Sequence, residues 1–221
     1  MSIKSNLQKV RSNLLSNVEL VAVSKYHTID DVREAYEAGQ RVFGESREQE
    51  LRLKYDALPK DIEWHFIGHM QTNKVKYIAP YISMIETVDS IKLMKEIEKQ
   101  AAKNSRTIDV LLELHLAQEE SKSGMLPDDC LTLLDEGEWR SLSHVRICGI
   151  MMMASNTDDE AQIRSEFLKA KELFDLIRQR YFADSEAFRI RSYGMSGDYL
   201  IAQECGSNHV RVGSSIFSAD N

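Results

Sequence analysis

The stretch ELVAVSKYHTIDDVREAYEAGQRVFG, residues 19–44, decides the fold class. Its apolar run at 19–24 predicts a buried strand, and 28–38 predicts an amphipathic helix that opens on a good N-cap residue. Gly39 suits a helix stop, and 41–44 predicts the next strand. A strand, a helix and a second strand in this order are typical of a parallel βαβ unit.

The same alternation of strand and helix continues along the chain. Eight βα units in 221 residues favour one α/β domain over 1–221, a single (β/α)8 TIM-type barrel. A doubly wound open sheet is the alternative. Further strands are predicted at 62–68, 82–88, 107–116, 145–152, 188–191 and 209–212. Further helices are predicted at 45–57, from 72, at 90–103, after Pro127, at 157–180 with Thr157 as its cap, and at 198–204.

Composition narrows the class of protein. The formal net charge of −7 predicts little affinity for nucleic acid or an anionic membrane surface. No apolar run approaches the ~20 residues that span a bilayer, and residues 1–15 lack the apolar region of a signal peptide. Cys130, Cys148 and Cys205 are widely spaced, so we expect neither a disulfide framework nor a zinc site, and we expect a cytoplasmic protein.

Lys25 is the first candidate for chemistry, because it follows an apolar run at the predicted carboxyl end of the first strand. Active sites of such barrels lie at that end. A lysine desolvated at the lip of a core has a neutral amine that can attack an aldehyde. An ordinary solvated lysine in a turn is the alternative from position alone.

Two segments rich in glycine and serine lie near the C-terminus, at 192–198 and 206–213. Backbone N–H groups and small hydroxyls in such loops can hold a phosphate. Barrels often bind phosphate after strands seven and eight, where we expect these segments to lie. Two ordinary turns would give the same composition.

Several longer motifs add a family resemblance that covers nearly the whole chain. The chain resembles the pyridoxal 5′-phosphate (PLP) homeostasis protein family, of the YggS/PROSC type, whose barrel is similar to the N-terminal domain of alanine racemase without its C-terminal β domain. The matching motifs are LVAVSKYHTIDDVREAYEAGQRVFGES (20–46), IEWHFIGHMQTNK (62–74), RICGIMMMAS (146–155), SYGMSGDYLIAQECGSN (192–208) and VRVGSSIF (210–217).

The resemblance implies a role for each matching position. Lys25 would hold PLP as a Schiff base, and Arg211 would face the pyridine nitrogen. Met195 and Ile67 would pack near the ring. The phosphate would be held by Ser196, Gly213 and Ser214, helped by the turn Gly206, Ser207 and Asn208. The chain departs from the family pattern at Ser46, where we expect asparagine, and at Asn208, where we expect threonine, so one cofactor hydrogen bond is in doubt at each.

Arg211 has a consequence for reactivity. Arginine stays protonated in proteins, so it gives no proton to a pyridine nitrogen, and the ring is then a weak electron sink. Racemisation also needs an acid–base group on each side of the substrate, and alanine racemase takes one from its second domain. We therefore expect a PLP carrier with little or no turnover, involved in vitamin B6 homeostasis, with PLP-dependent apo-enzymes as recipients and a monomeric state.

Two other functions remain open at this point: a weak PLP-dependent amino-acid racemase, and a phosphate-binding barrel enzyme without PLP. We expect no metal at His65 and His69, because they do not share a helix face with a catalytic glutamate. For the other residues, we expect structural roles or a position near the site. Met151–Met153 should pack in the barrel, and the charged cluster at 45–52 should be a solvated helix face. Tyr26 and Tyr193 should lie beside the site.

Overall fold

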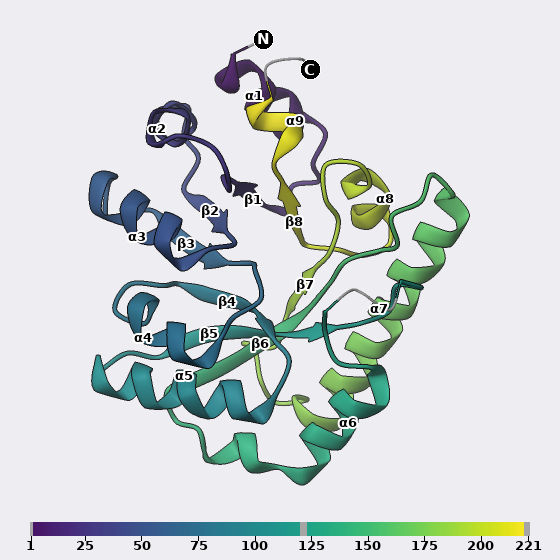
Figure 1. Ribbon diagram of the computed structural model, residues 1–221. Helices are drawn as coiled ribbons and strands as arrows, with labels where there is room; N and C mark the ends of the chain where they lie inside the picture. The colour runs from purple at the N-terminus through teal and green to yellow at the C-terminus, as the bar shows by residue number, and fades with distance from the viewer. Residues whose placement is uncertain (1, 120–122, 219–221) are drawn as a thin grey trace.

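The computed structural model describes residues 2–119 and 123–218. Its eight parallel strands close into a barrel in chain order, and the helices form a ring around them (Figure 1). Hydrogen bonding between the first and last strands closes the barrel, with Val21 opposite Arg211. The predicted (β/α)8 barrel is therefore confirmed, and the open doubly wound sheet is excluded.

The strands lie close to the predicted positions, and two of them, β6 and β8, have the predicted bounds. The strands are β1 Glu19–Val23, β2 Val42–Glu45, β3 Glu63–Phe66, β4 Met84–Val88, β5 Ile108–Leu114, β6 Val145–Met152, β7 Ile190–Ser192 and β8 His209–Val212. The helices are α1 Ile3–Ser12, α2 Ile29–Glu37, α3 Glu48–Ala57, α4 Val75–Ile78, α5 Ile91–Lys103, α6 Pro127–Glu136, α7 Glu160–Tyr181, α8 Tyr199–Glu204 and α9 Ser214–Phe217, with short 3₁₀ turns at Thr72–Lys74 and Glu138–Ser141.

One predicted helix start is wrong. The carboxylate of Asp159, and not Thr157, caps α7, because it accepts hydrogen bonds from the backbone N–H groups of Ala161 and Gln162. The Thr157 hydroxyl instead accepts a hydrogen bond from the Asp159 N–H at 3.1 Å. Asp159, one of the acidic residues that follow Thr157, therefore caps the helix and does not only interact with the helix dipole.

Helix α1 lies outside the predicted elements. Ser2 caps it, and Leu7 and Val10 bury its inner face. Asn6 is also buried and donates to the carbonyl of Ile216 at 3.1 Å, which ties α1 to α9. Figure 1 shows the two helices side by side. No helix in the described part of the chain is long and apolar enough to cross a membrane.

The apolar core has two layers. A large outer layer packs the strands against the helices, and a smaller cluster of strand residues fills part of the barrel interior: Met84, Leu111, Cys148, Met151 and Ile190. Because strand side chains alternate between the two layers, every second residue of a strand points into the barrel. The interior also holds a polar group of His65, Glu86, Ser192 and Arg211.

Candidate functional site

A pocket of about 340 Å³ opens at the carboxyl ends of the strands. This end of a barrel is where active sites are built. Most of the residues predicted for the cofactor site meet here. The lining residues are Val23, Lys25, Ile67, Met153, Met195, Ser196, Gly197, Arg211, Gly213 and Ser214. Val23, Met153 and Gly197 are additions. The two-residue period of β1 and β6 could have found the first two, since Val23 shares a face with Lys25, and Gly197 lies in the glycine-rich segment 192–198.

Lys25 follows β1 and reaches the pocket from an exposed position. The structure therefore shows the solvated alternative for Lys25 and not a desolvated position at the lip of the core. Its neighbour Tyr26 takes a left-handed backbone conformation, with φ of 68°, which is costly for a residue with a side chain. The Tyr26 N–H donates to the Glu50 carboxylate at 3.2 Å, which holds the turn that presents Lys25.

A buried ion pair supports this turn from the outer side of the barrel. Lys54 Nζ donates to the Ser24 carbonyl at 2.8 Å and to Glu45 Oε1 at 2.5 Å. The Ser24 hydroxyl donates to the same carboxylate oxygen at 2.7 Å. Burial raises the pKa of Glu45, and this effect outweighs the opposing charge of Lys54. The expectation of a solvated helix face at 45–52 is wrong for Glu45 and Glu48, both of which are buried.

The loops after β7 and β8 meet at Ser196. Its hydroxyl oxygen accepts hydrogen bonds from the backbone N–H groups of Gly213, at 3.1 Å, and of Ser215, at 3.5 Å. Gly213 also lies close to β1, because a Cβ at this position would meet the Val23 carbonyl oxygen at 3.0 Å. The two loops thus form one wall of the pocket out of small residues and backbone groups, which suits an anion.

Arg211 forms the floor of the pocket and is 4% exposed. Its Nη1 donates to the carbonyl and the hydroxyl of Ser192, and its Nη2 donates to the Met152 carbonyl at 2.9 Å. The carboxylate of Glu86 lies 3.7 Å from Nη1. Burial lowers the pKa of Arg211 from its ordinary value, and the charge of Glu86 opposes this. An arginine keeps its proton under such conditions, so the floor carries a fixed guanidinium cation.

The turn Gly206–Asn208 lies outside the pocket. It comes directly before β8, so it lies at the amino-terminal end of that strand, whereas Lys25 follows the carboxyl end of β1. The Ser207 hydroxyl donates to the Tyr193 carbonyl at 2.7 Å, and the Asn208 side chain bridges backbone groups of Arg189 and Arg191. The expectation that this turn helps to hold a phosphate is wrong for this reason, and its side chains pair with β7 instead.

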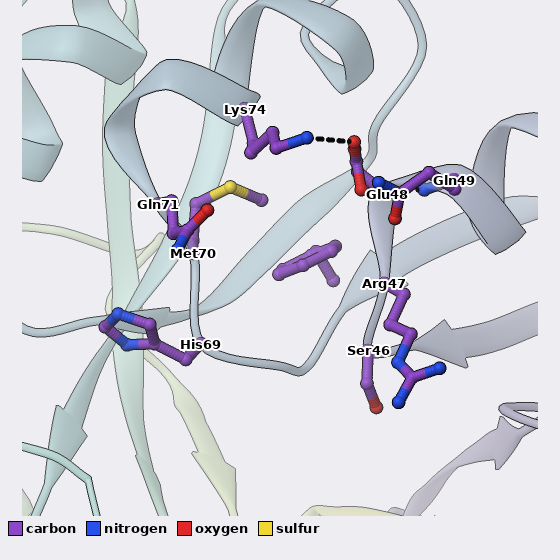
Figure 2. Close-up of a pocket in the computed structure, with 9 residues that line it drawn as sticks. Ser46, Arg47, Glu48, Gln49, His69, Met70, Gln71 and Lys74 are labelled. Atoms are coloured by element: carbon purple, nitrogen blue, oxygen red, sulfur yellow. Dashed lines mark hydrogen bonds and ion pairs between the residues drawn. The ribbon is translucent and has the colours of Figure 1, made fainter.

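Ser46 lines a neighbouring pocket of about 210 Å³ rather than the one at Lys25. Figure 2 shows it beside Arg47, opposite the segment that carries His69 and Met70. The dashed line in Figure 2 marks the 2.8 Å ion pair between Lys74 and Glu48. The backbone of Ser46 packs tightly against Gly68, where a Cβ would come within 2.2 Å of the Ser46 carbonyl oxygen. Ser46 is therefore not among the residues that line the pocket at Lys25.

The two tyrosines expected beside the site differ in position. Tyr26 is 70% exposed, whereas Tyr193 is fully buried, packs on Phe167 and donates to the Cys205 carbonyl. His65 is buried and lies 2.7 Å from Glu86, while His69 is exposed. Within the described residues, no group of three or more His, Cys, Asp or Glu side chains is arranged to hold a metal ion.

Comparisons with known proteins agree with this geometry. The model of the alanine racemase N-terminal domain family matches residues 1–221. The pyridoxal phosphate homeostasis protein of Haemophilus influenzae is 33% identical, over 100% of this chain and 97% of its own length. The structure of PipY from Synechococcus elongatus with PLP bound superposes with a TM-score of 0.88 at 31% identity, over 98% of this chain and 100% of PipY. Alanine racemase of Clostridium difficile shares the fold, with a TM-score of 0.76 at 13% identity over 99% of this chain and 57% of the racemase.

The fold and the pocket thus define a barrel of the alanine racemase N-terminal domain class, with a lysine at the end of its first strand. Within that class, the chain belongs to the pyridoxal phosphate homeostasis protein family. The resemblance stated from the sequence motifs is therefore confirmed.

Proposed function

We propose that this protein binds PLP as a Schiff base on Lys25 and serves in PLP homeostasis with little or no turnover. The observation that carries the proposal is the convergence of three groups on one pocket: the Lys25 amine, the buried Arg211 guanidinium and the loops joined by Ser196. An amine, a cation and an anion-binding wall match the aldehyde, the ring nitrogen and the phosphate of PLP. PipY, which is similar over its whole length, binds PLP.

The pocket fits PLP in its volume and in the chemistry of its lining residues. Ligand pockets are typically about 300–1,000 Å³, and this one is about 340 Å³. Ile67, Met153 and Met195 supply apolar contacts for an aromatic ring. Gly213 and Gly197 keep the wall free of side chains where a phosphate would approach, and a Cβ added at Gly197 would have no atom within 4 Å. We assign the phosphate contacts to Ser196, Gly213 and Ser214, and we leave out Ser46, Gly206, Ser207 and Asn208.

Arg211 argues for a carrier rather than an enzyme. Three of its five N–H groups are already engaged with Ser192 and Met152, which leaves the Nε–H and one Nη2–H as donors that can face the ring nitrogen. A guanidinium donates a hydrogen bond there but keeps its proton, so PLP bound in this pocket supplies an aldehyde for reversible capture and only a weak electron sink. A weak amino-acid racemase is the alternative, because the barrel shares its fold with alanine racemase.

The proposal also covers the partners, the oligomeric state and the cellular compartment of the protein. We propose PLP-dependent apo-enzymes as recipients of the bound cofactor and a monomer as the working state. The three cysteines are buried and free of disulfide bonds, which suits a reducing compartment such as the cytoplasm.

Titration of the purified protein with PLP tests this function. We expect visible absorption of a Schiff base in the wild type and in Lys92→Ala, which removes an exposed lysine on α5, but not in Lys25→Ala. Circular dichroism should report the same fold for all three proteins. Adding L-alanine or D-alanine then separates the carrier from the racemase: interconversion at a rate on the order of 1 s⁻¹ would favour the racemase. Binding of inorganic phosphate without any PLP signal would favour a barrel enzyme that does not use PLP.

A further inference from the structure

Glu86 is a buried carboxylate in the barrel interior that the proposed cofactor contacts do not use. It lies on β4 and has no exposed surface. Its Oε1 lies 2.7 Å from His65 Nδ1, and its Oε2 accepts from the Ser192 hydroxyl at 2.6 Å. Burying an unpaired carboxylate would be very costly, so the partners of Glu86 determine whether it can carry charge there.

The carboxylate is charged despite its burial. Burial alone would raise the pKa of Glu86, but hydrogen bonds and charge from His65, Arg211 and Ser192 together bring it to about 2. His209 is stacked on His65 and is neutral at physiological pH, because burial lowers its pKa to about 4. The partners that stabilise the Glu86 charge are therefore His65, which lies at 2.7 Å and has the larger effect, and the Arg211 guanidinium at 3.7 Å.

Ser192 links the two charges geometrically. Its hydroxyl donates to Glu86 and accepts from Arg211 Nη1 at 2.6 Å, while its carbonyl accepts from the same Nη1 at 2.8 Å. Glu86 lies on β4, Ser192 on β7 and Arg211 on β8, so this series of contacts crosses the barrel beneath the pocket. Glu113 and Asp198 are the other carboxylates whose charges act on Arg211; Glu113 accepts from the Ser123 hydroxyl and Asp198 from the backbone of its own loop.

We propose that Glu86 is the positioning residue for Arg211: it fixes the guanidinium through Ser192 and offsets part of its charge, so that the floor of the cofactor pocket is less cationic than Arg211 alone would make it. The inference rests on the proposed function, because a role toward PLP requires that PLP binds above Arg211. Without Glu86, the guanidinium would lose its largest opposing charge and would act more strongly on the pocket across a medium of low polarity. A protonated Schiff base at Lys25 would then be less stable, since two cations would face each other.

The test is a pH titration of the visible absorption of the PLP-loaded protein. In Glu86→Gln, we expect the protonated Schiff base to lose its proton at a pH lower by about one unit than in the wild type. Glu86→Asp keeps the charge and should return the midpoint most of the way to the wild-type value. Glu98→Gln is the matched control, because Glu98 also accepts from a histidine, His144, but lies on α5 outside the barrel. A Glu86→Gln midpoint equal to that of the wild type would overturn the inference.

Ser192→Ala supplies a second test that does not depend on the folding of the glutamine variant. It keeps both charges and cuts the hydrogen-bonded link, so PLP affinity should fall about tenfold with little change in the midpoint. Unchanged affinity would overturn the positioning role. A wild-type protein that gives no Schiff-base absorption at all would instead contradict the proposed function, and that outcome is distinct from both results above.

Discussion

The hydroxyl oxygen of Ser196 accepts a hydrogen bond from the backbone N–H of Gly213 at 3.1 Å. This contact joins the loop that follows β7 to the loop that follows β8, although the two residues are separated by α8 and a strand. It sets the shape of the wall where we propose that the phosphate of PLP binds.

Ser196→Ala should weaken PLP binding about tenfold, because the phosphate loses a hydroxyl partner and the two loops lose their link. Pyridoxal, which lacks the phosphate, should bind the variant nearly as well as it binds the wild type. Fluorescence titration with both ligands measures the two affinities. Equal losses for PLP and pyridoxal would show that Ser196 does not act on the phosphate.

Gly213→Ala should lower the melting temperature of the protein without PLP, whereas Gly197→Ala should change it little. A Cβ at Gly213 would meet the Val23 carbonyl oxygen at 3.0 Å and the Val23 Cβ at 3.2 Å, while a Cβ at Gly197 would meet nothing within 4 Å. Thermal unfolding with and without PLP measures both variants. If the two substitutions behave alike, the close approach of Gly213 to β1 is not important.

Lys54→Met should lower the free energy of unfolding by about 3–5 kcal/mol, because it leaves the Glu45 carboxylate buried without a cation. The double variant Glu45→Gln, Lys54→Met should recover part of this loss. Lys171→Met is the control: it breaks an exposed pair with Asp175, which contributes about 0.5 kcal/mol or less. Urea unfolding gives the three values, and a Lys54→Met loss no larger than that of the control would contradict the account.

The barrel itself could be predicted because its signals are local. Buried strands such as β1 and β6 are apolar runs, and capped amphipathic helices separate them. That Lys25 and Arg211 line one pocket could be expected because the motifs around them are specific, while their roles toward PLP stay predictions. The position of the turn Gly206–Asn208 could not be predicted, because composition does not tell whether a glycine turn follows a strand or precedes the next one.

The buried charges could not be predicted from local patterns. Glu45 and Lys54 lie in a run of mixed charge that is typical of a solvated helix, and only the packing of α3 on β2 buries them. Glu86 and Arg211 come together only when the barrel closes, because they are far apart in the sequence. The left-handed conformation of Tyr26, next to the exposed Lys25, is likewise not indicated by any local pattern.

Glu86 should make the protein sensitive to acid. Its pKa is about 2 in the folded protein and near 4.5 in the unfolded chain, so its contribution is fully present above about pH 4.5 and is lost as the pH falls toward 2. The slope of unfolding free energy against pH in this window should therefore be smaller in Glu86→Gln than in the wild type. Urea unfolding at several pH values measures the slopes, and equal slopes would contradict a charged Glu86.

The most direct test of the central claim is reduction of the PLP-loaded protein with borohydride, followed by peptide mass spectrometry. Reduction makes a Schiff base permanent, so the account predicts one PLP adduct per chain, on the peptide that contains Lys25. An adduct on another lysine, or no adduct under conditions where PLP is bound, would contradict it.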